Sequence, residues 1–386
     1  MTTDSPIAQA KNETVRSERS SKKLVLFIIS FVVAFLGTYL LKDDSFSEAQ
    51  EEVFFLLLFS VSLWLTEAVP AFAAGMFIIV FLVFTQGFGM LTDTPRNLQY
   101  IQIYLNTFSS SVIWLMLGGF FLAAAMTKTR LDVELIQLTL RVSGKDPKWI
   151  LFAMMLVTMT ISMLISNTAA TAMVIASLMP LITQIGKLSP VGKGLILGIP
   201  IAATTGGMGT IIGSPPNAVA AGVLATAGHP VNFVQWIYYG LPIALLLTLF
   251  AWMLLVRLFM RNAEPFTMTQ LVNVDKASDP NSRLQRIIVM IVLAVTLALW
   301  LTNPLHGLSA AAVSAVPLVA LTLSGVLKNE DVRGVGWDTL LLVAGGLALG
   351  TGLQQTGLLE IYSRKIAVLP VSHTTFYFLL AYATML

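Results

Sequence analysis

An apolar segment from Leu195 to about Leu224 is interrupted by the stretch Thr204-Thr205-Gly206-Gly207-Met208-Gly209-Thr210-Ile211-Ile212-Gly213-Ser214-Pro215-Pro216-Asn217. Four glycines weaken a helix here, and the proline pair stops one because proline lacks an N–H donor and clashes with the preceding turn. The stretch predicts a discontinuous membrane helix, with free carbonyl groups for a cation and free N–H groups after Pro216 for an anion. The alternative interpretation is a simple kink or loop. No Lys-Ser/Thr follows the glycines and no strand precedes them, which argues against a nucleotide-binding loop.

Composition places this stretch in a membrane protein. Of the 386 residues, 56% are hydrophobic and 11% are charged, whereas soluble domains have about 25% charged residues. The mean hydropathy of +0.81 requires a surface that faces lipid. We therefore expect an all-α polytopic membrane protein, and the cations between apolar segments mark cytoplasmic loops.

Enzymatic chemistry has no support in the sequence. There is no cysteine, and the three histidines lie far apart, so no metal pattern forms. Neither a Ser-His-acid set, nor a Walker motif, nor a pair of catalytic carboxylates is present. We expect no enzyme activity and no cofactor.

Apolar and polar segments divide the chain into five parts. We expect a polar cytoplasmic tail at 1–23, a first membrane helix at 24–48, a first repeat at 49–260, a connecting loop at 261–286 and an incomplete second repeat at 287–386. The apolar run from Leu24 to Leu41 is long enough to span a bilayer. We also expect Arg130 and Asp132 to mark a helix end.

Two short matches indicate that the halves are related. Leu63-Trp64-Leu65-Thr66 recurs as Leu299-Trp300-Leu301-Thr302, and the glycine pair at 118–119 recurs at 345–346. Repeated halves are typical of secondary transporters, whose substrate site lies where the halves meet. The two glycine pairs are 227 positions apart, and the same offset places a partner of Ser166-Asn167-Thr168 near position 393. We therefore expect the chain to be C-terminally truncated.

A second polar cluster, Ser162 to Thr168, lies between two short apolar arms at 149–165 and 169–186. Lysines flank the outer ends of both arms, which predicts that both ends face the cytoplasm. The cluster then lies at the tip of a re-entrant hairpin, where free carbonyl groups are tolerated only beside a cavity or inside protein. Neutral Ser and Asn oxygens suit Na⁺, and the Asn167 amide and Thr168 hydroxyl suit a carboxylate. Alternatively, Ser and Thr bond to helix carbonyls and Asn167 joins two helices.

These motifs resemble the divalent anion/sodium symporter family, over roughly residues 50 to 386. The resemblance rests on Trp64-Leu65-Thr66-Glu67-Ala68-Val69-Pro70, on Ser166-Asn167-Thr168, and on Gly206 to Asn217. It implies a homodimer of inverted-repeat protomers with a transport part that moves as an elevator. It also implies sodium ligands at Ser162, Ser166, Asn167 and Gly213, and substrate contacts at Asn167, Thr168 and Ser214. A second Ser-Asn-Thr hairpin, which supplies the other half-site in this family, is not among the 386 residues.

The function expected from the sequence is sodium-coupled transport of a divalent anion, such as succinate, malate or fumarate, with Na⁺ as the coupling ion. We expect a bacterial cytoplasmic membrane protein with a cytoplasmic N-terminus. Alternatives are a dicarboxylate exchanger, an arsenite or Na⁺/H⁺ type carrier, and, from another class, a non-transporting membrane scaffold or enzyme.

Overall fold

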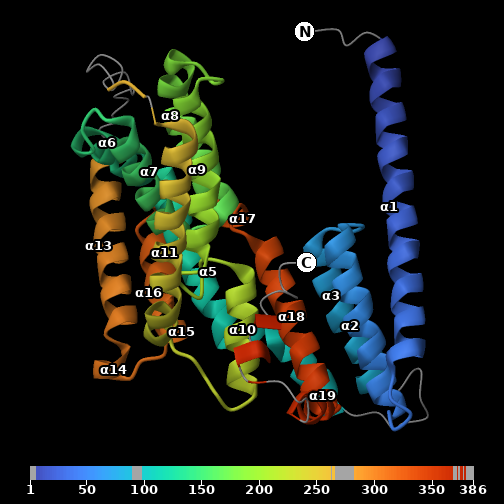
Figure 1. Cartoon of the computed structure of the whole chain (residues 1–386). Helices are drawn as coiled ribbons and strands as arrows, with labels where there is room; N and C mark the ends of the chain where they lie inside the picture. The colour runs from blue at the N-terminus through green and yellow to red at the C-terminus, as the bar shows by residue number, and fades with distance from the viewer. Residues whose placement is uncertain are drawn as a thin grey trace. The chain divides into compact units, whose positions relative to one another are not determined.

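The computed structural model describes residues 6–88, 98–261, 263–265 and 282–367, together with 372, 374–376, 378 and 379. Every regular element in these ranges is helical (Figure 1), which confirms the all-α prediction. The chain divides into two compact units: Met1–Leu105 with Ala348–Leu386, and Asn106–Leu347. We describe each unit by itself.

The first unit is built on three helices joined by short turns. Its elements are α1 (Pro6–Leu41), α2 (Glu48–Thr66), α3 (Ala71–Leu82), the π-helical turn η1 (Val83–Gly87), α4 (Leu98–Leu105), the end of α18 and α19 (Leu358–Ala367). A capping box fixes the start of α2, since the Ser47 side chain accepts from the Gln50 amide while the Gln50 side chain accepts from the Ser47 amide. Phe59 and Leu63 of α2 pack with Ala34 of α1 in the core of this unit.

The second unit contains the remaining helices. They are η2 (Asn106–Ser109), α5 (Ser111–Lys128), α6 (Leu131–Val142), α7 (Pro147–Ser162), α8 (Asn167–Ile185), α9 (Pro190–Gly207), α10 (Pro215–Thr226), α11 (Phe233–Phe259), α13 (Ser282–Leu301), α14 (Asn303–His306), α15 (Ala310–Val313), α16 (Ala315–Leu323), α17 (Asn329–Arg333) and the start of α18 (Trp337–Gln355). Helix α9 packs against α7, α8 and α11 around one apolar core. Helix α5 packs against α15 and α16.

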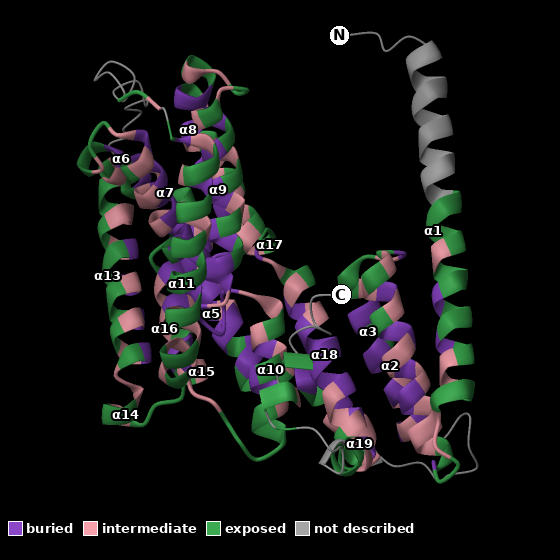
Figure 2. Ribbon diagram, in the orientation of Figure 1, coloured by how far each residue is buried: buried purple, intermediate pink, exposed green. Residues whose placement is uncertain are grey.

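Seven of the described helical segments are long and apolar enough to cross a membrane. They are Ser21–Leu41, Glu48–Thr66, Gln99–Lys128, Asn167–Ile185, Phe233–Phe259, Arg283–Leu301 and Asn329–Gln355. Figure 2 shows exposed residues along most of the described part of α1 and along α11. Exposed apolar side chains on long helices indicate lipid contact, so the protein is a polytopic integral membrane protein.

The structure sets helix bounds that composition left open. Helix α1 already begins at Pro6, so the polar residues from there to 23 are helical. Helix α7 has 16 residues and is therefore about 24 Å long, shorter than a bilayer core of about 30 Å. Arg130, with φ 55°, separates α5 from α6, which confirms the predicted helix end. Most of the expected connecting loop at 261–286 lies outside the described residues, and so do most of residues 374–386 at the end of the expected second repeat.

Candidate functional site

Two helix interruptions lie in the second unit. Helix α7 ends at Ser162 and α8 begins at Asn167, which leaves a tip at residues 163–166. Helix α9 ends at Gly207 and α10 begins at Pro215, which leaves a break at residues 208–214. The glycine- and proline-rich stretch does interrupt a helix, but α9 continues through Thr204 to Gly207, further than the sequence indicated.

Close backbone contact explains why α9 carries glycines at its end. A Cβ atom on Gly206 would lie 2.3 Å from the Met159 carbonyl oxygen of α7, and one on Gly207 would lie 2.4 Å from Asn167 Oδ1. Real Cβ atoms do not approach other heavy atoms this closely. The two glycines therefore bring the end of α9 against α7 and against the first residue of α8.

Ser162 lies where these helices meet, and it is fully buried. Its Oγ lies 2.7 Å from the Ala203 carbonyl oxygen and 2.7 Å from Asn167 Oδ1. A hydroxyl group has one hydrogen to donate, so it satisfies only one of these two acceptors. The second oxygen–oxygen contact needs either a reversed Asn167 amide, whose Nδ2 would donate to the Ser162 hydroxyl, or a cation between the oxygens.

The Asn217 side chain holds the break in a folded-back conformation. Asn217 Nδ2 donates to the Gly207 carbonyl oxygen at 2.7 Å and to the Thr210 carbonyl oxygen at 2.8 Å. Both oxygens belong to residues at the end of α9 or just after it, where helical partners are missing. One amide thus ties α10 to the far side of the break.

Thr210 joins the break to the tip. Its hydroxyl donates to the Met163 carbonyl oxygen and accepts from the Gly213 amide at 3.0 Å. The residue is 2% exposed, so water does not compete for these bonds. A Cβ atom on Gly213 would lie 2.7 Å from the Gly207 carbonyl oxygen and 3.1 Å from that of Ser162. The last carbonyl groups of α7 and α9 therefore both lie beside Gly213.

Both helices that follow the interruptions begin with a serine. The Ser166 hydroxyl accepts from the Ala169 amide at 3.3 Å, as an N-cap does. Ser214 occupies the same position on α10 but makes no side-chain cap hydrogen bond. The first-turn N–H groups of α8 carry partial positive charge that favours an anion. Helix α10 begins with Pro215 and Pro216, which have no N–H, so its N-terminus contributes mainly its helix dipole.

The residues nominated from the sequence fall into two groups. Ser162, Asn167 and Gly213 come together through the contacts described above. Ser166 and Thr168 are exposed and Ser214 is half-buried, and these three make no side-chain hydrogen bond to one another. Sequence reasoning assigned no role to Thr210 or Asn217. The signal for Asn217 was its place in the first turn after the proline pair, where an amide can reach back to the preceding carbonyl groups.

The tip and the break present neutral oxygen and nitrogen atoms. No Asp, Glu, Lys, Arg or His occurs in residues 159–171 or 203–218. Among the described residues, no cluster of three His, Cys, Asp or Glu residues could hold a metal ion. A buried carboxylate does lie on the neighbouring helix α6, where burial raises the pKa of Asp132. The arrangement at the interruptions suits a weakly charged cation such as Na⁺ and an anion at the helix N-termini.

Known proteins with similar sequences are transporters. The chain is 26% identical to an inorganic phosphate transporter of Saccharomyces cerevisiae, PHO87, over 79% of this chain and 32% of that protein. It is 27% identical to the sodium-dependent high-affinity dicarboxylate transporter 3 of Caenorhabditis elegans, over 76% of this chain and 60% of that protein. It is also 27% identical to the sodium-dependent dicarboxylate transporter SdcS of Staphylococcus saprophyticus, over 87% of this chain and 68% of that protein.

The chain spans between about a third and two thirds of the length of the curated relatives it matches. A family model described as citrate transporter matches residues 61–386, which include both helix interruptions. The family and these relatives are transporters and not enzymes. Helical architecture, membrane-spanning segments and this match agree, and the chain belongs to the citrate transporter family.

Proposed function

We propose that this protein carries divalent anions across the membrane together with Na⁺, and that its substrates are C4-dicarboxylates such as succinate, malate or fumarate. The observation that carries the proposal is the buried Ser162 hydroxyl, whose Oγ lies 2.7 Å from two acceptor oxygens. With Asn167 Oδ1 facing Ser162, a cation where the two interruptions meet satisfies this excess of oxygens. Sodium dependence in two relatives supports the same ion.

Four residues are proposed to bind Na⁺: Ser162, Ser166, Asn167 and Gly213. Ser162 and Asn167 supply side-chain oxygens, and the carbonyl groups around Gly213 supply the remainder. These ligands are neutral, so the bound ion keeps its full positive charge. That charge remains available to attract an anion nearby.

The anion is proposed to contact Asn167, Thr168 and Ser214. The Thr168 side chain is exposed at the start of α8, and the Ser214 hydroxyl is not used for capping. Each residue lies at a helix N-terminus, where an anion gains about 0.3–1 kcal/mol or more from the helix dipole. One carboxylate of the substrate is expected here, and the other is expected at the second half-site that the family resemblance implies.

Coupling is proposed to follow from the order of binding. Na⁺ binds first, orders the tip against the break and adds positive charge beside the two helix N-termini. The anion then binds with higher affinity, because its binding free energy includes attraction to that charge. The loaded transport part moves across the membrane as an elevator in each protomer of a homodimer.

The inverted-repeat proposal is supported by two similar helix junctions 227 positions apart. At the end of α5 the Thr129 hydroxyl donates to the Ala125 carbonyl oxygen at 2.7 Å, and Arg130 follows with φ 55°. At the end of α18 the Thr356 hydroxyl donates to the Gly352 carbonyl oxygen at 2.8 Å, and Gly357 follows with φ 75°.

Helices α6 and α19 begin immediately after these residues. On this proposal, residues 49–260 and 287–386 belong to the two repeats, and 261–286 connect them. The cytoplasmic membrane of a bacterium, with the N-terminus inside, is the proposed location. The basic residues before Leu24 support this orientation.

A second candidate substrate is inorganic phosphate, which is also a divalent anion. The similarity to the yeast phosphate transporter favours it. A hydrogen-bonding site at two helix N-termini suits phosphate as well as a carboxylate. The two candidates differ in length, since a dicarboxylate needs two separated anion sites.

Uptake by the full-length protein in proteoliposomes tests the proposal. Radiolabelled succinate is added with an inward Na⁺ gradient, or with K⁺ in place of Na⁺, and unlabelled phosphate is added as a competitor. We expect uptake only with Na⁺ and no competition by phosphate at tenfold excess. Equal uptake in K⁺ would contradict sodium coupling, and phosphate uptake without succinate uptake would favour the second candidate.

A further inference from the structure

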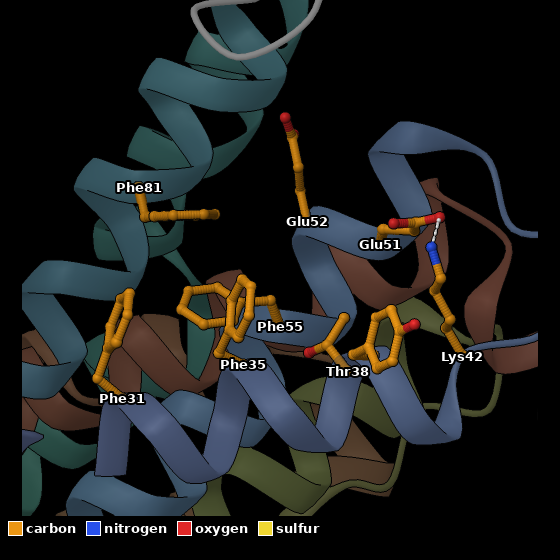
Figure 3. Close-up of a pocket in the computed structure, with 9 residues that line it drawn as sticks. Phe31, Phe35, Thr38, Lys42, Glu51, Glu52, Phe55 and Phe81 are labelled. Atoms are coloured by element: carbon orange, nitrogen blue, oxygen red, sulfur yellow. Dashed lines mark hydrogen bonds and ion pairs between the residues drawn. The ribbon is translucent and has the colours of Figure 1, made fainter. Parts of the chain in front are cut away.

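The first unit contains a cavity of about 540 Å³ between α1, α2 and α3 (Figure 3). Its size lies in the range of about 300–1,000 Å³ that is typical of ligand pockets. Phenylalanine rings line it from all three helices: Phe31 and Phe35 from α1, Phe55 from α2 and Phe81 from α3. None of these residues belongs to the tip or the break.

The aromatic part of this cavity faces the lipid. Phe31 and Phe35 are 47% and 59% exposed, and they lie within the span Ser21–Leu41. The Phe31 and Phe55 rings meet edge to face with centroids 5.6 Å apart, so the wall between α1 and α2 is already packed. An occupant in contact with these rings must be apolar, and in a bilayer the available apolar group is an acyl chain.

One end of the cavity is charged. Lys42 Nζ lies 2.8 Å from Glu51 Oε1 (Figure 3), and each side chain is about one-third exposed. Lys42 directly follows the last residue of α1, and Glu51 lies in the first turn of α2. Both therefore lie where the apolar spans end, at the depth of lipid head groups. Glu52 adds a second carboxylate to the lining.

We propose that this cavity binds a membrane phospholipid with a zwitterionic head group. The acyl chain lies against the phenylalanine rings, the phosphate pairs with Lys42 and the head-group ammonium pairs with Glu51. A zwitterion matches an existing Lys–Glu pair in both signs, as complementary interfaces require. An anionic lipid matches only Lys42 and faces the Glu51 carboxylate, so it binds more weakly. Tyr39, which is 71% exposed, also offers its ring to an ammonium group.

Photo-crosslinking in proteoliposomes tests this site on the full-length protein. The probe is phosphatidylcholine with a diazirine on its acyl chain, and mass spectrometry maps the labelled residues. We expect labels to concentrate on Phe35, Phe55 and Phe81. Competition by unlabelled phosphatidylglycerol is expected to need about five times more lipid than competition by phosphatidylcholine, since one favourable charge contact near a membrane surface is worth about that factor.

Labels spread evenly along the lipid-facing side of α1 would overturn the proposal, as would equal competition by the two lipids. Crosslinks between two copies of the chain at these phenylalanines would also overturn it, because a second copy would then occupy the cavity.

Charge-removing variants separate head-group recognition from general lipid contact. Lys42→Met with Glu51→Gln removes both charges. This double variant is expected to abolish the preference for phosphatidylcholine while the residues of the cavity are still labelled. The matched control removes the exposed α19 pair with Glu360→Gln and Arg364→Met, whose charged atoms are 3.7 Å apart. That control is expected to keep the preference. A Lys42/Glu51 variant that elutes and melts like the parent yet keeps the preference would contradict the proposal.

Discussion

The tip at 163–166 and the break at 208–214 interrupt helices by different means. The tip contains no glycine, and a serine N-cap starts the next helix. The break contains glycines, packs backbone against backbone and is cross-linked by the Asn217 amide. Ser166 at the tip and Thr168 just after it are exposed, whereas Thr210 in the break is buried. This difference indicates that the break is a rigid frame and that the tip presents groups to the ligand.

We expect the largest loss of stability from a substitution of Gly206, which lies at the end of α9 just before the break. Gly206→Ala forces a Cβ atom against the Met159 backbone, and overpacking of this kind costs about 1–3 kcal/mol or more. Gly198→Ala on the same helix is the matched control, because its Cβ would meet the Leu151 side chain at 2.7 Å, and a side chain can move. We expect little monodisperse Gly206→Ala protein after extraction, and a nearly normal melting temperature for Gly198→Ala. Equal behaviour of the two variants would show that the contact is not rigid.

Thr210 connects the break to the tip, and we expect its substitution to change Na⁺ binding. Thr210→Val keeps the shape but removes the hydroxyl that donates to the Met163 carbonyl oxygen, at a cost of about 1–3 kcal/mol. The Gly213 amide loses its bond to that hydroxyl and keeps only the longer one, at 3.4 Å, to the backbone carbonyl oxygen of residue 210. If the link positions the sodium ligands, the Na⁺ concentration for half-maximal uptake rises about tenfold. Thr210→Ser keeps the hydroxyl, and we expect its Na⁺ concentration for half-maximal uptake to equal that of the parent. A valine variant with a normal Na⁺ response would mean that Thr210 only supports the fold.

Local signals predicted both interruptions, but not what holds them together. Glycine and proline restrict or free the backbone at their own positions, so the break was visible in the sequence. The Ser-Asn-Thr cluster likewise indicated the tip. The bond from Thr210 to Met163 joins residues 47 positions apart, and the contact of Gly206 with Met159 is of the same kind. Such contacts depend on how α7 and α9 pack, which no local pattern specifies.

Substitutions of the two N-cap serines, Ser166 and Ser214, are expected to have smaller effects. Ser166→Ala removes a cap bond and is expected to lower stability by about 1 kcal/mol. Ser214 makes no cap bond, so Ser214→Ala is expected to leave the melting temperature unchanged and to raise the KM for succinate severalfold. Loss of stability in Ser214→Ala, with KM unchanged, would assign Ser214 to the frame instead of the anion site.

The smallest effect is expected from Asp132, on the helix beside α7. Burial raises the pKa of Asp132, so its contribution to stability is greatest at low pH and is lost as pH rises through that raised value. Asp132→Asn removes this pH dependence, and we expect a modestly higher melting temperature than the parent at pH 7.5 and a similar one near pH 4. The Na⁺ response should not change, because neither interruption contains a titratable side chain. A shifted Na⁺ response would place Asp132 in the coupling path.

Asn167 tests the central claim most directly, because it is proposed to contact both the ion and the anion. Sodium-dependent succinate binding is measured on purified full-length protein carrying Asn167→Ala. Thr160→Ala is the control, since that exposed threonine bonds only to the Leu156 carbonyl oxygen of its own helix. We predict that Asn167→Ala folds normally and shows no sodium-dependent binding, while Thr160→Ala binds like the parent. Unchanged sodium-dependent binding by Asn167→Ala would contradict the account.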